Sequence, residues 1–505
     1  MAQRVIGRES SWPLIRVSAV LLVAVMAAGA CGDADDGAES EPASPETAAV
    51  AETAAPGESQ DGAAPESASA ADDDGQEAPV AAEALSDSDV DEGANTSQPA
   101  EDESAAPEEA PATTVAPVVE RTITIGLAYP DISAFATLNK KFDIGDPEQQ
   151  AAAVLDGWRR DGLLPVNGTD IELVFRKYAI LNSDDKLGVC TGFAQDDDVF
   201  AVVSGRDFTV GAECLAARFE IPTIDLMGAA PSVYERAPRL FTIRPNEAEV
   251  LRAYVQWADG LGLFDDATVG IFWDTRSEEA VVAFKEAMAA AGHEIAVEIA
   301  SDGRGVGSPQ DQISVERFIA AGVDAAVLLV GTSSVSNFMH FAESQGYRPA
   351  YRSMEWASQI GDVASGSLNQ DQYDGTLAMT VSRVGEIAAG MTLNAETEAC
   401  ISNYERFSGT DIAAVSPETA EWTQILYTCD LMSVLLAGLQ GAGDDLTRES
   451  LVASLESLEG FPLAAWGDLT FGPGDHAGVQ QFRTVEWSAD CLCWTARTDM
   501  VDFSG

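Results

Sequence analysis

Basic residues are scarce in this chain of 505 residues, which has 28 Lys and Arg against 83 Asp and Glu. The formal net charge of −55 gives a surface that repels phosphate backbones, whereas nucleic-acid binding requires a basic footprint. The composition therefore excludes nucleic acid as a partner. Histidine is also rare, and we interpret His293, His340 and His476, which lie far apart in sequence, as surface or hydrogen-bonded residues.

Sequence motifs of enzymes are missing as well. The chain has no Gly-X-Ser-X-Gly nucleophile elbow, no His-Glu-X-X-His zinc helix and no phosphate-binding loop. The run Gly303-Arg304-Gly305-Val306-Gly307 lies in a polar loop and opens no helix at the required place, so we interpret it as a flexible connection. We therefore predict a binding protein with no catalytic residue, no cofactor and no metal.

The N-terminus has the pattern of an export signal. Three arginines precede an apolar run from Val17 to Ala30, which is shorter than the roughly 20 residues that span a bilayer. The sequence Ala28-Gly29-Ala30-Cys31 resembles the lipobox of bacterial lipoproteins, in which a peptidase cuts before the cysteine and its sulfur receives a lipid. We predict a lipid anchor at Cys31 on the extracytoplasmic face of the cell membrane. The alternative is ordinary secretion with cleavage near Ala30.

An acidic segment follows this cysteine. Residues 32–117 contain 24 acidic residues but no Lys, no Arg and no aromatic residue. Such a composition buries too little apolar surface to offset the entropy of ordering the chain, and its like charges repel one another. We therefore predict a disordered, extended linker. Weak Ca²⁺ capture by Asp72, Asp73 and Asp74 is an alternative that the sequence supports less.

Six cysteines remain for disulfides once Cys31 is assigned to the lipid. Disulfides persist outside the cytoplasm, and six cysteines allow 15 pairings. Neighbouring predicted helices favour two local bridges, Cys190–Cys214 and Cys400–Cys429. Cys491 and Cys493 then pair with each other or exchange partners with the second bridge.

Residues 118–505 are too many for one ordinary core and predict two lobes. Apolar strands alternate with amphipathic helices in both halves of this region, which predicts parallel sheets with helices on both faces. The predicted strands are 123–128, 171–178, 199–204 and 221–226 in the first half and 268–273, 293–299, 324–330 and 350–354 in the second.

Several helices have recognisable ends. Asn246 caps a helix over 247–261, with Glu249 in the position of a capping box. Ser416-Pro417 opens a long helix through Leu439 that is apolar on most faces, which predicts burial inside a lobe. Thr447 caps a further short helix.

Three motifs together resemble the type I periplasmic binding proteins, and among them the leucine/isoleucine/valine-binding branch. They are Phe200-Ala201-Val202-Val203-Ser204-Gly205, Phe241-Thr242-Ile243-Arg244-Pro245 and Leu469-Thr470-Phe471-Gly472-Pro473-Gly474-Asp475-His476. The resemblance implies two Rossmann-like lobes joined by a three-segment hinge, crossed near Arg244, near Val381 and before the C-terminal hairpin. It also implies a small solute, such as an amino acid or an amide-like compound, and ABC transporter permease subunits as partners. A lipid-anchored solute sensor of the same fold is the alternative.

Together with the N-terminal signals, the resemblance divides the chain into six segments. A signal peptide is expected at 1–30 and a lipidated linker at 31–117. Lobe 1 then occupies 118–244 and most of 381–460, and lobe 2 occupies 245–380 and the hinge return with the C-terminal hairpin at 461–505.

Candidate ligand contacts lie where predicted strands end, as is usual in open α/β sheets. They are Ser204, Gly205, Arg206, Met227 and Ala229 in the first lobe and Asp274, Thr332, Glu355 and Trp356 in the second. Arg206 either donates to an acidic group of the solute or pairs with Asp207 at the rim. The resemblance implies that Glu355 receives a cationic group of the solute, and the alternative is a solvated carboxylate or one that pairs with Arg352.

Overall fold

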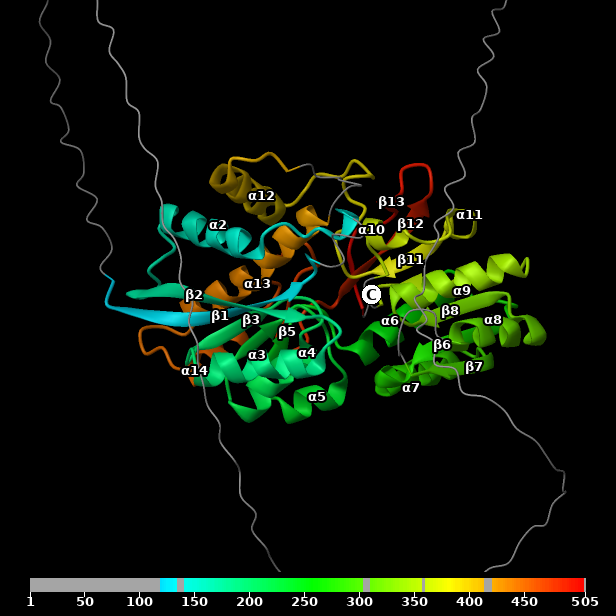
Figure 1. The fold of residues 1–505 in the computed structure, drawn as a ribbon, viewed down its shortest axis with the longest axis horizontal. Coiled ribbons are helices and arrows are strands. Elements are labelled where there is room, and N and C mark those ends of the chain that lie inside the picture. Colours follow the sequence, from blue (N-terminus) through cyan, green and yellow to red (C-terminus); the bar gives the residue numbers. More distant parts are fainter. Residues whose placement is uncertain (1–118, 134–139, 303–308, 357–358, 413–419, 504–505) are drawn as a thin grey trace, which may run out of the picture. The chain divides into compact units, whose positions relative to one another are not determined.

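A computed structural model describes residues 119–503 apart from 134–139, 303–308, 357–358 and 413–419 (Figure 1). The predicted signal peptide, the lipidated Cys31, the acidic linker and the loop 303–307 lie outside the described residues. The described chain forms two α/β lobes, each built on a parallel sheet.

Lobe 1 contains a sheet of five parallel strands in the order β2-β1-β3-β4-β5. The central strands are almost entirely buried, as expected for parallel strands with helices on both faces. Their bounds are β1 Arg121–Asp131, β2 Thr169–Ala179, β3 Ala201–Ser204, β4 Thr223–Asp225 and β5 Leu240–Thr242. The first four overlap the strands predicted from the sequence.

Helices cover both faces of this sheet (Figure 1). One face packs against α2 Pro147–Arg160, α12 Ala395–Ser408, α13 Glu421–Gly441 and α14 Arg448–Leu455. The other packs against α3 Ser183–Gln195, α4 Thr209–Glu213, the π-helical turn η2 Cys214–Arg218 and α5 Pro231–Arg236. A short 3₁₀ turn, η1 Lys140–Phe142, precedes α2.

Helix α13 is the long apolar helix predicted from the sequence. By length and composition alone it is apolar enough to cross a membrane, but 72% of its most apolar window is buried inside the protein. It is therefore a core helix of lobe 1. The following helix α14 begins with a capping box, in which the Thr447 side chain accepts the backbone N–H of Ser450 and the Ser450 side chain accepts the backbone N–H of Thr447.

Lobe 2 contains a parallel sheet in the order β7-β6-β8-β9. The strands are β6 Val269–Asp274, β7 Ile295–Ser301, β8 Ala325–Leu329 and β9 Ala350–Tyr351, and a 3₁₀ turn η3 Thr275–Ser277 follows β6. One face packs against α6 Glu247–Gly260 and α7 Glu278–Ala290, and the other against α8 Pro309–Ala321 and α9 Thr332–Ser344. Asn246 caps α6 as predicted, because its side chain accepts the N–H of Glu249.

A second, mixed sheet completes lobe 2. Its strands β10 Ser353–Met354 and β11 Leu377–Thr380 are parallel, whereas β12 Gln481–Ser488, β13 Cys493–Ala496 and β14 Val501–Asp502 pair antiparallel. Two short helices, α10 Asp362–Ser365 and α11 Gln370–Tyr373, precede β11. The strand predicted over 350–354 is therefore divided between two sheets, and Arg352 lies at the division.

Three disulfides are present among the described residues, with the pairing that the sequence favours. Cys190–Cys214 joins α3 to η2, and Cys400–Cys429 joins α12 to α13. Cys491–Cys493 closes the turn between β12 and β13. The first two bridges each tie neighbouring helices of lobe 1 together.

The chain passes between the lobes three times, between β5 and α6, between β11 and α12, and between α14 and β12. These crossings form backbone hydrogen bonds with one another. Gly478 donates to the carbonyl of Thr242 at 2.9 Å, and Arg383 donates to the carbonyl of Ala465 at 2.8 Å. The three segments therefore form one hydrogen-bonded hinge, which is the connection expected from the resemblance.

Candidate functional site in the interlobe cleft

A cleft of about 1360 Å³ lies between the two lobes. Its walls include the segments that follow β3 and β4 in lobe 1 and β6, β8 and β10 in lobe 2. Ligands of open α/β sheets bind beyond the carboxyl ends of the strands, where side chains and free backbone groups converge. The cleft brings two such edges together, one from each sheet.

Most of the contact residues predicted from the sequence line this cleft. They are Arg206, Met227 and Ala229 in lobe 1 and Asp274, Thr332, Glu355 and Trp356 in lobe 2. Ser204 and Gly205 are not among the lining residues. Ser204 is fully buried at the last position of β3, where its register partner is Asp225 of β4, and Gly205 donates its N–H to the carbonyl of Ala128. Both residues therefore lie inside lobe 1, next to the loop that carries Arg206.

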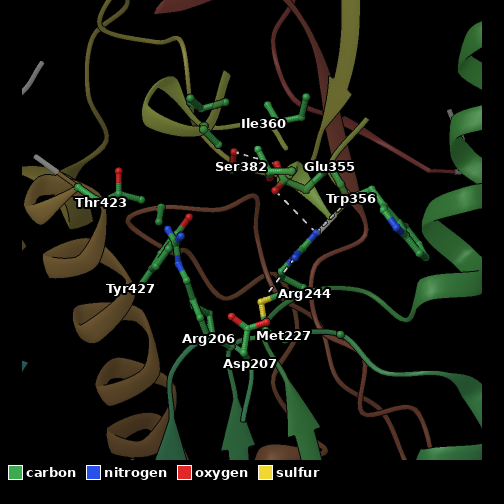
Figure 2. Close-up of a pocket in the computed structure, with 18 of the residues that line it drawn as sticks. Arg206, Asp207, Met227, Arg244, Glu355, Trp356, Ile360, Ser382, Thr423 and Tyr427 are labelled. Carbon is green, nitrogen blue, oxygen red and sulfur yellow. Dashed lines mark hydrogen bonds and ion pairs between the residues drawn. The ribbon is translucent and has the colours of Figure 1, made fainter. Parts of the chain in front are cut away.

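Arg206 lies against an aromatic ring and not against an acidic residue. Its guanidinium carbon is 4.9 Å from the ring centroid of Tyr427 on α13, within the range of a cation–π contact. Figure 2 shows the two side chains next to each other. The ion pair with Asp207 that the sequence left open is not formed in the described part of the chain.

Tyr427 belongs to an aromatic and cationic stack that sequence reasoning missed. Its ring stacks on Trp466 with centroids 5.2 Å apart and planes inclined by 19°. The guanidinium of Arg244 lies 5.7 Å from the Trp466 ring on the hinge. Arg206, Tyr427, Trp466 and Arg244 all line the cleft, and Trp466 is only 2% exposed, so these four side chains form one packed part of the cleft wall.

Arg244 connects the first hinge crossing to lobe 2. Its Nη2 donates to the backbone carbonyl of Glu355 at 2.8 Å and lies 3.7 Å from Glu355 Oε1 (Figure 2). The side chains are 8% and 5% exposed, so this is a buried ion pair. Thr380 Oγ1 donates to the other carboxylate oxygen at 2.6 Å.

The Glu355 carboxylate therefore already has partners inside the protein. Its partner is Arg244 and not Arg352, the alternative partner considered from the sequence. Glu355 nevertheless lines the cleft, so its contact with a cationic group of the solute stays a prediction.

Asp274, at the end of β6, is also paired. Arg276 Nε lies 3.0 and 3.1 Å from the two carboxylate oxygens, and the Arg276 backbone N–H donates to the same group. Burial tends to raise the pKa of Asp274, but the hydrogen bonds and charge of Arg276 lower it overall. This carboxylate is therefore held ionised at the lobe 2 wall.

A buried carboxyl group lies beneath the lobe 1 loops. Asp225, the last residue of β4, is fully buried, and its Oδ1 accepts the N–H of Met227 at 2.8 Å. Burial raises its pKa to about 8. This hydrogen bond fixes the turn that places Met227 in the cleft wall.

Hydroxyl groups dominate the lobe 2 edge after β8. Thr332, Ser333 and Ser334 occupy the first turn of α9 and line the cleft. Trp356, which is 6% exposed, lines the same lobe beyond β10. Among the described residues no group of three His, Cys, Asp or Glu side chains is suited to hold a metal ion.

The structure has two α/β lobes, a hinge of three chain segments, and a cleft at the carboxyl ends of the strands of both sheets. These features define a two-lobed solute-binding fold. The family model described as periplasmic binding protein matches residues 122–491. The chain therefore belongs to the periplasmic binding protein family, which comprises binding proteins and not enzymes. No curated protein sequence matches the chain significantly.

Solved structures share this fold at low sequence identity. One is a solute-binding protein of an ABC transporter from Rhodopseudomonas palustris BisB5, solved in complex with 3,4-dihydroxybenzoic acid. It is 18% identical to this chain with a TM-score of 0.54, and the match covers 75% of this chain and 97% of the other chain. A leucine-binding protein from Thermotoga maritima MSB8 is 13% identical with a TM-score of 0.57, covering 75% and 99%. A possible leucine/isoleucine/valine-binding protein from Rhodopirellula baltica SH 1 is 14% identical with a TM-score of 0.58, covering 76% and 98%.

Proposed function

We propose that this protein is the extracytoplasmic solute-binding subunit of an ABC importer, held at the cell membrane by a lipid on Cys31. The observation that supports binding most directly is the cleft at the carboxyl ends of two sheets whose lobes are joined by a three-segment hinge. Closing such lobes around a solute expels water and surrounds its polar groups with hydrogen-bonding partners. The permease subunits then distinguish the closed form from the open form.

The size of the cleft fits this mechanism. Its volume of about 1360 Å³ exceeds the roughly 300–1,000 Å³ typical of formed ligand pockets. Rotation about the hinge brings Thr332 and Trp356 of lobe 2 toward Arg206 of lobe 1 and reduces that volume around a bound molecule. The walls combine indole and phenol rings with charged groups, which suits a small solute that has both a polar and an apolar part.

A thermal-shift screen of the full-length protein tests the proposal. Amino acids and amides are the compounds expected from the sequence, and organic acids extend the panel because a structural neighbour binds 3,4-dihydroxybenzoic acid. A specific ligand at 100 times its dissociation constant stabilises the native state by about 2.7 kcal/mol, which raises the melting temperature measurably. Failure of every class of solute to shift the melting temperature contradicts the proposed function.

A further inference from the structure

The Cys491–Cys493 disulfide differs from the other two bridges in its exposure. Cys491 is exposed on the surface of lobe 2, and Cys493, the first residue of β13, is 5% exposed. The other two bridges join helices of lobe 1 and consist of buried or half-buried cysteines. Attack on a disulfide requires access to one of its sulfurs, and exposed bridges are the labile and regulatory ones. Among the three bridges, Cys491 is therefore the residue that an external thiol reaches most readily.

The fold depends little on this bridge. β12 and β13 form an antiparallel hairpin in which Ser488 pairs with Cys493, so the strand ladder already closes the turn 489–492. The bridge joins residues only 2 positions apart, compared with 24 and 29 for the other two. A disulfide stabilises a fold mainly by restricting the unfolded chain, and a short loop restricts it least. Opening this bridge therefore costs the fold less than opening either of the others.

The bridge lies next to the wall of the cleft. Cys493 and Trp494 both line the cleft, as does Asp362 at the start of α10. The Trp494 backbone N–H donates to Asp362 Oδ1 at 2.9 Å, and its indole N–H donates to Ser365 Oγ at 2.9 Å. These bonds hold α10 beside β13 (Figure 1). A change at Cys493 thus reaches α10 through the next residue in the chain.

Two carboxylates lie at the turn that carries Cys491. Asp490 precedes it in the chain and is exposed, and Asp374 Oδ1 accepts the backbone N–H of Ala489 at 2.8 Å. Charges closer together than the Debye length, about 10 Å at 0.1 M salt, are only partly screened. The surroundings of Cys491 therefore favour a cationic thiol over an anionic one.

We propose that Cys491–Cys493 is a thiol–disulfide exchange site that accepts a small cationic thiol and controls the mobility of the cleft wall at α10. The thiolate attacks the Cys491 sulfur and forms a bond to it, while the bond to Cys493 breaks and Cys493 leaves as a thiolate that takes up a proton from water. The Cys493 thiolate reverses this step when it attacks Cys491 and expels the small thiol. A second thiol molecule instead attacks the sulfur of the attached one, which leaves both cysteines reduced and the two thiol molecules joined as a disulfide.

Opening the bridge acts on the cleft through the hairpin. The closed bridge holds the turn 489–492 against the first residue of β13, directly before Trp494. When the bridge opens, the turn gains backbone freedom, and the hydrogen bonds from Trp494 to α10 break more often. The backbone amides of α10 then exchange with solvent faster. This inference goes beyond the proposed function, because it does not depend on which solute the cleft binds.

Reduction of the folded protein tests the accessibility of the bridge. The full-length protein is incubated with increasing concentrations of cysteamine, quenched with acid, alkylated and mapped by peptide mass spectrometry. We expect Cys491–Cys493 to open, with cysteamine attached to Cys491, at concentrations about tenfold lower than those that open the other bridges. Circular dichroism should be unchanged at that concentration. Opening of the three bridges together, or earlier opening of either lobe 1 bridge, overturns the exchange site.

Matched variants identify the attacked sulfur. Cys493→Ser leaves the exposed Cys491 thiol, whereas Cys491→Ser leaves the buried Cys493 thiol. With cystamine, the disulfide of cysteamine, Cys493→Ser should form a mixed disulfide at least about tenfold faster than Cys491→Ser. Equal rates for the two variants overturn the assignment of Cys491.

A comparison of two thiols tests the charge preference. At low salt the anion 3-mercaptopropionate should open the wild-type bridge at least about threefold more slowly than cysteamine, with rates expressed per thiolate. Equal rates for the two thiols overturn the preference for a cation.

Hydrogen exchange tests the connection to the cleft. In the double variant Cys491→Ser/Cys493→Ser, which lacks the bridge, the amides of 361–366 should exchange at least about threefold faster than in the wild type. Helix α7 packs on the other face of the lobe 2 sheet and serves as the control whose exchange should not change. Unchanged exchange at 361–366 overturns the control of the cleft wall by the bridge. These measurements involve no solute, so their failure leaves the proposed function standing.

Discussion

The buried pair of Arg244 and Glu355 makes a quantitative prediction about the hinge. The two charges lie 3.7 Å apart with side chains 8% and 5% exposed. At an effective dielectric constant of about 20, Coulomb attraction at this separation is about 4 kcal/mol, and the cost of removing both charges from water offsets part of it. Removing one member of a buried pair costs about 3–5 kcal/mol, because the other charge remains buried without its partner.

We therefore expect Arg244→Met and Glu355→Gln each to lower the free energy of unfolding by about 3 kcal/mol. The double variant removes both charges, so its loss should be smaller than the sum of the single losses by about 2 kcal/mol. The measurement is equilibrium urea unfolding without solute, followed by tryptophan fluorescence and circular dichroism. Coincidence of the two transitions justifies a two-state treatment.

A matched cycle on an exposed pair provides the control. Arg497 and Glu486 form an ion pair with side chains 50% and 34% exposed, and such surface pairs contribute about 0–1 kcal/mol. The cycle with Arg497→Met and Glu486→Gln should therefore give a much smaller coupling energy. A coupling below about 0.5 kcal/mol for the Arg244 and Glu355 cycle would refute the description of this pair as a buried connection across the hinge.

Three further predictions concern other parts of the chain. Burial raises the folded pKa of Asp225 to about 8, above its unfolded value, so its contribution to stability is lost as pH rises toward 8. Asparagine does not titrate, so the free energy of unfolding of Asp225→Asn minus that of the wild type should increase by at least about 1 kcal/mol from pH 5 to pH 9, as measured by urea unfolding. A difference that does not change with pH would contradict a buried, protonated Asp225. The Cys190–Cys214 bridge joins residues 24 positions apart and so lowers the entropy of the unfolded chain. Replacing both cysteines by serine should therefore cost about 3 kcal/mol in the same assay, and a loss below about 1 kcal/mol contradicts this explanation. Cys31→Ser should abolish lipid labelling and detergent partitioning, because the thioether requires sulfur, and a variant that stays labelled disproves the anchor.

Much of the fold was predictable from the sequence because parallel sheets leave a regular pattern. Buried strands such as Val269–Asp274 are continuous apolar runs, and capping residues such as Asn246 and Thr447 mark where helices begin. The division of 350–354 between two sheets was not predictable from the sequence. No glycine or proline interrupts this segment, and the division arises only because 350–351 pair with β8 whereas 353–354 pair with β11.

The site was predictable where it follows strand ends and not elsewhere. Arg206 and Glu355 were found because each comes soon after a predicted strand. Tyr427 lies on a helix that is apolar on most faces, so nothing in the sequence distinguishes its cleft-lining position from those of its apolar neighbours. Trp466 lies in an irregular hinge segment without periodicity, and the pairing of Arg244 with Glu355 joins residues 111 positions apart.

The central claim is that the two lobes close around a small solute bound in the cleft. Spin labels at Phe407→Cys on α12 and Ile319→Cys on α8, both exposed positions outside the cleft, report the distance between the lobes. Double electron–electron resonance is recorded on the full-length protein with and without a saturating amount of the compound that stabilises it most. The account predicts a shorter and narrower distance distribution when the solute is present, and a distribution unchanged by a bound solute would contradict it.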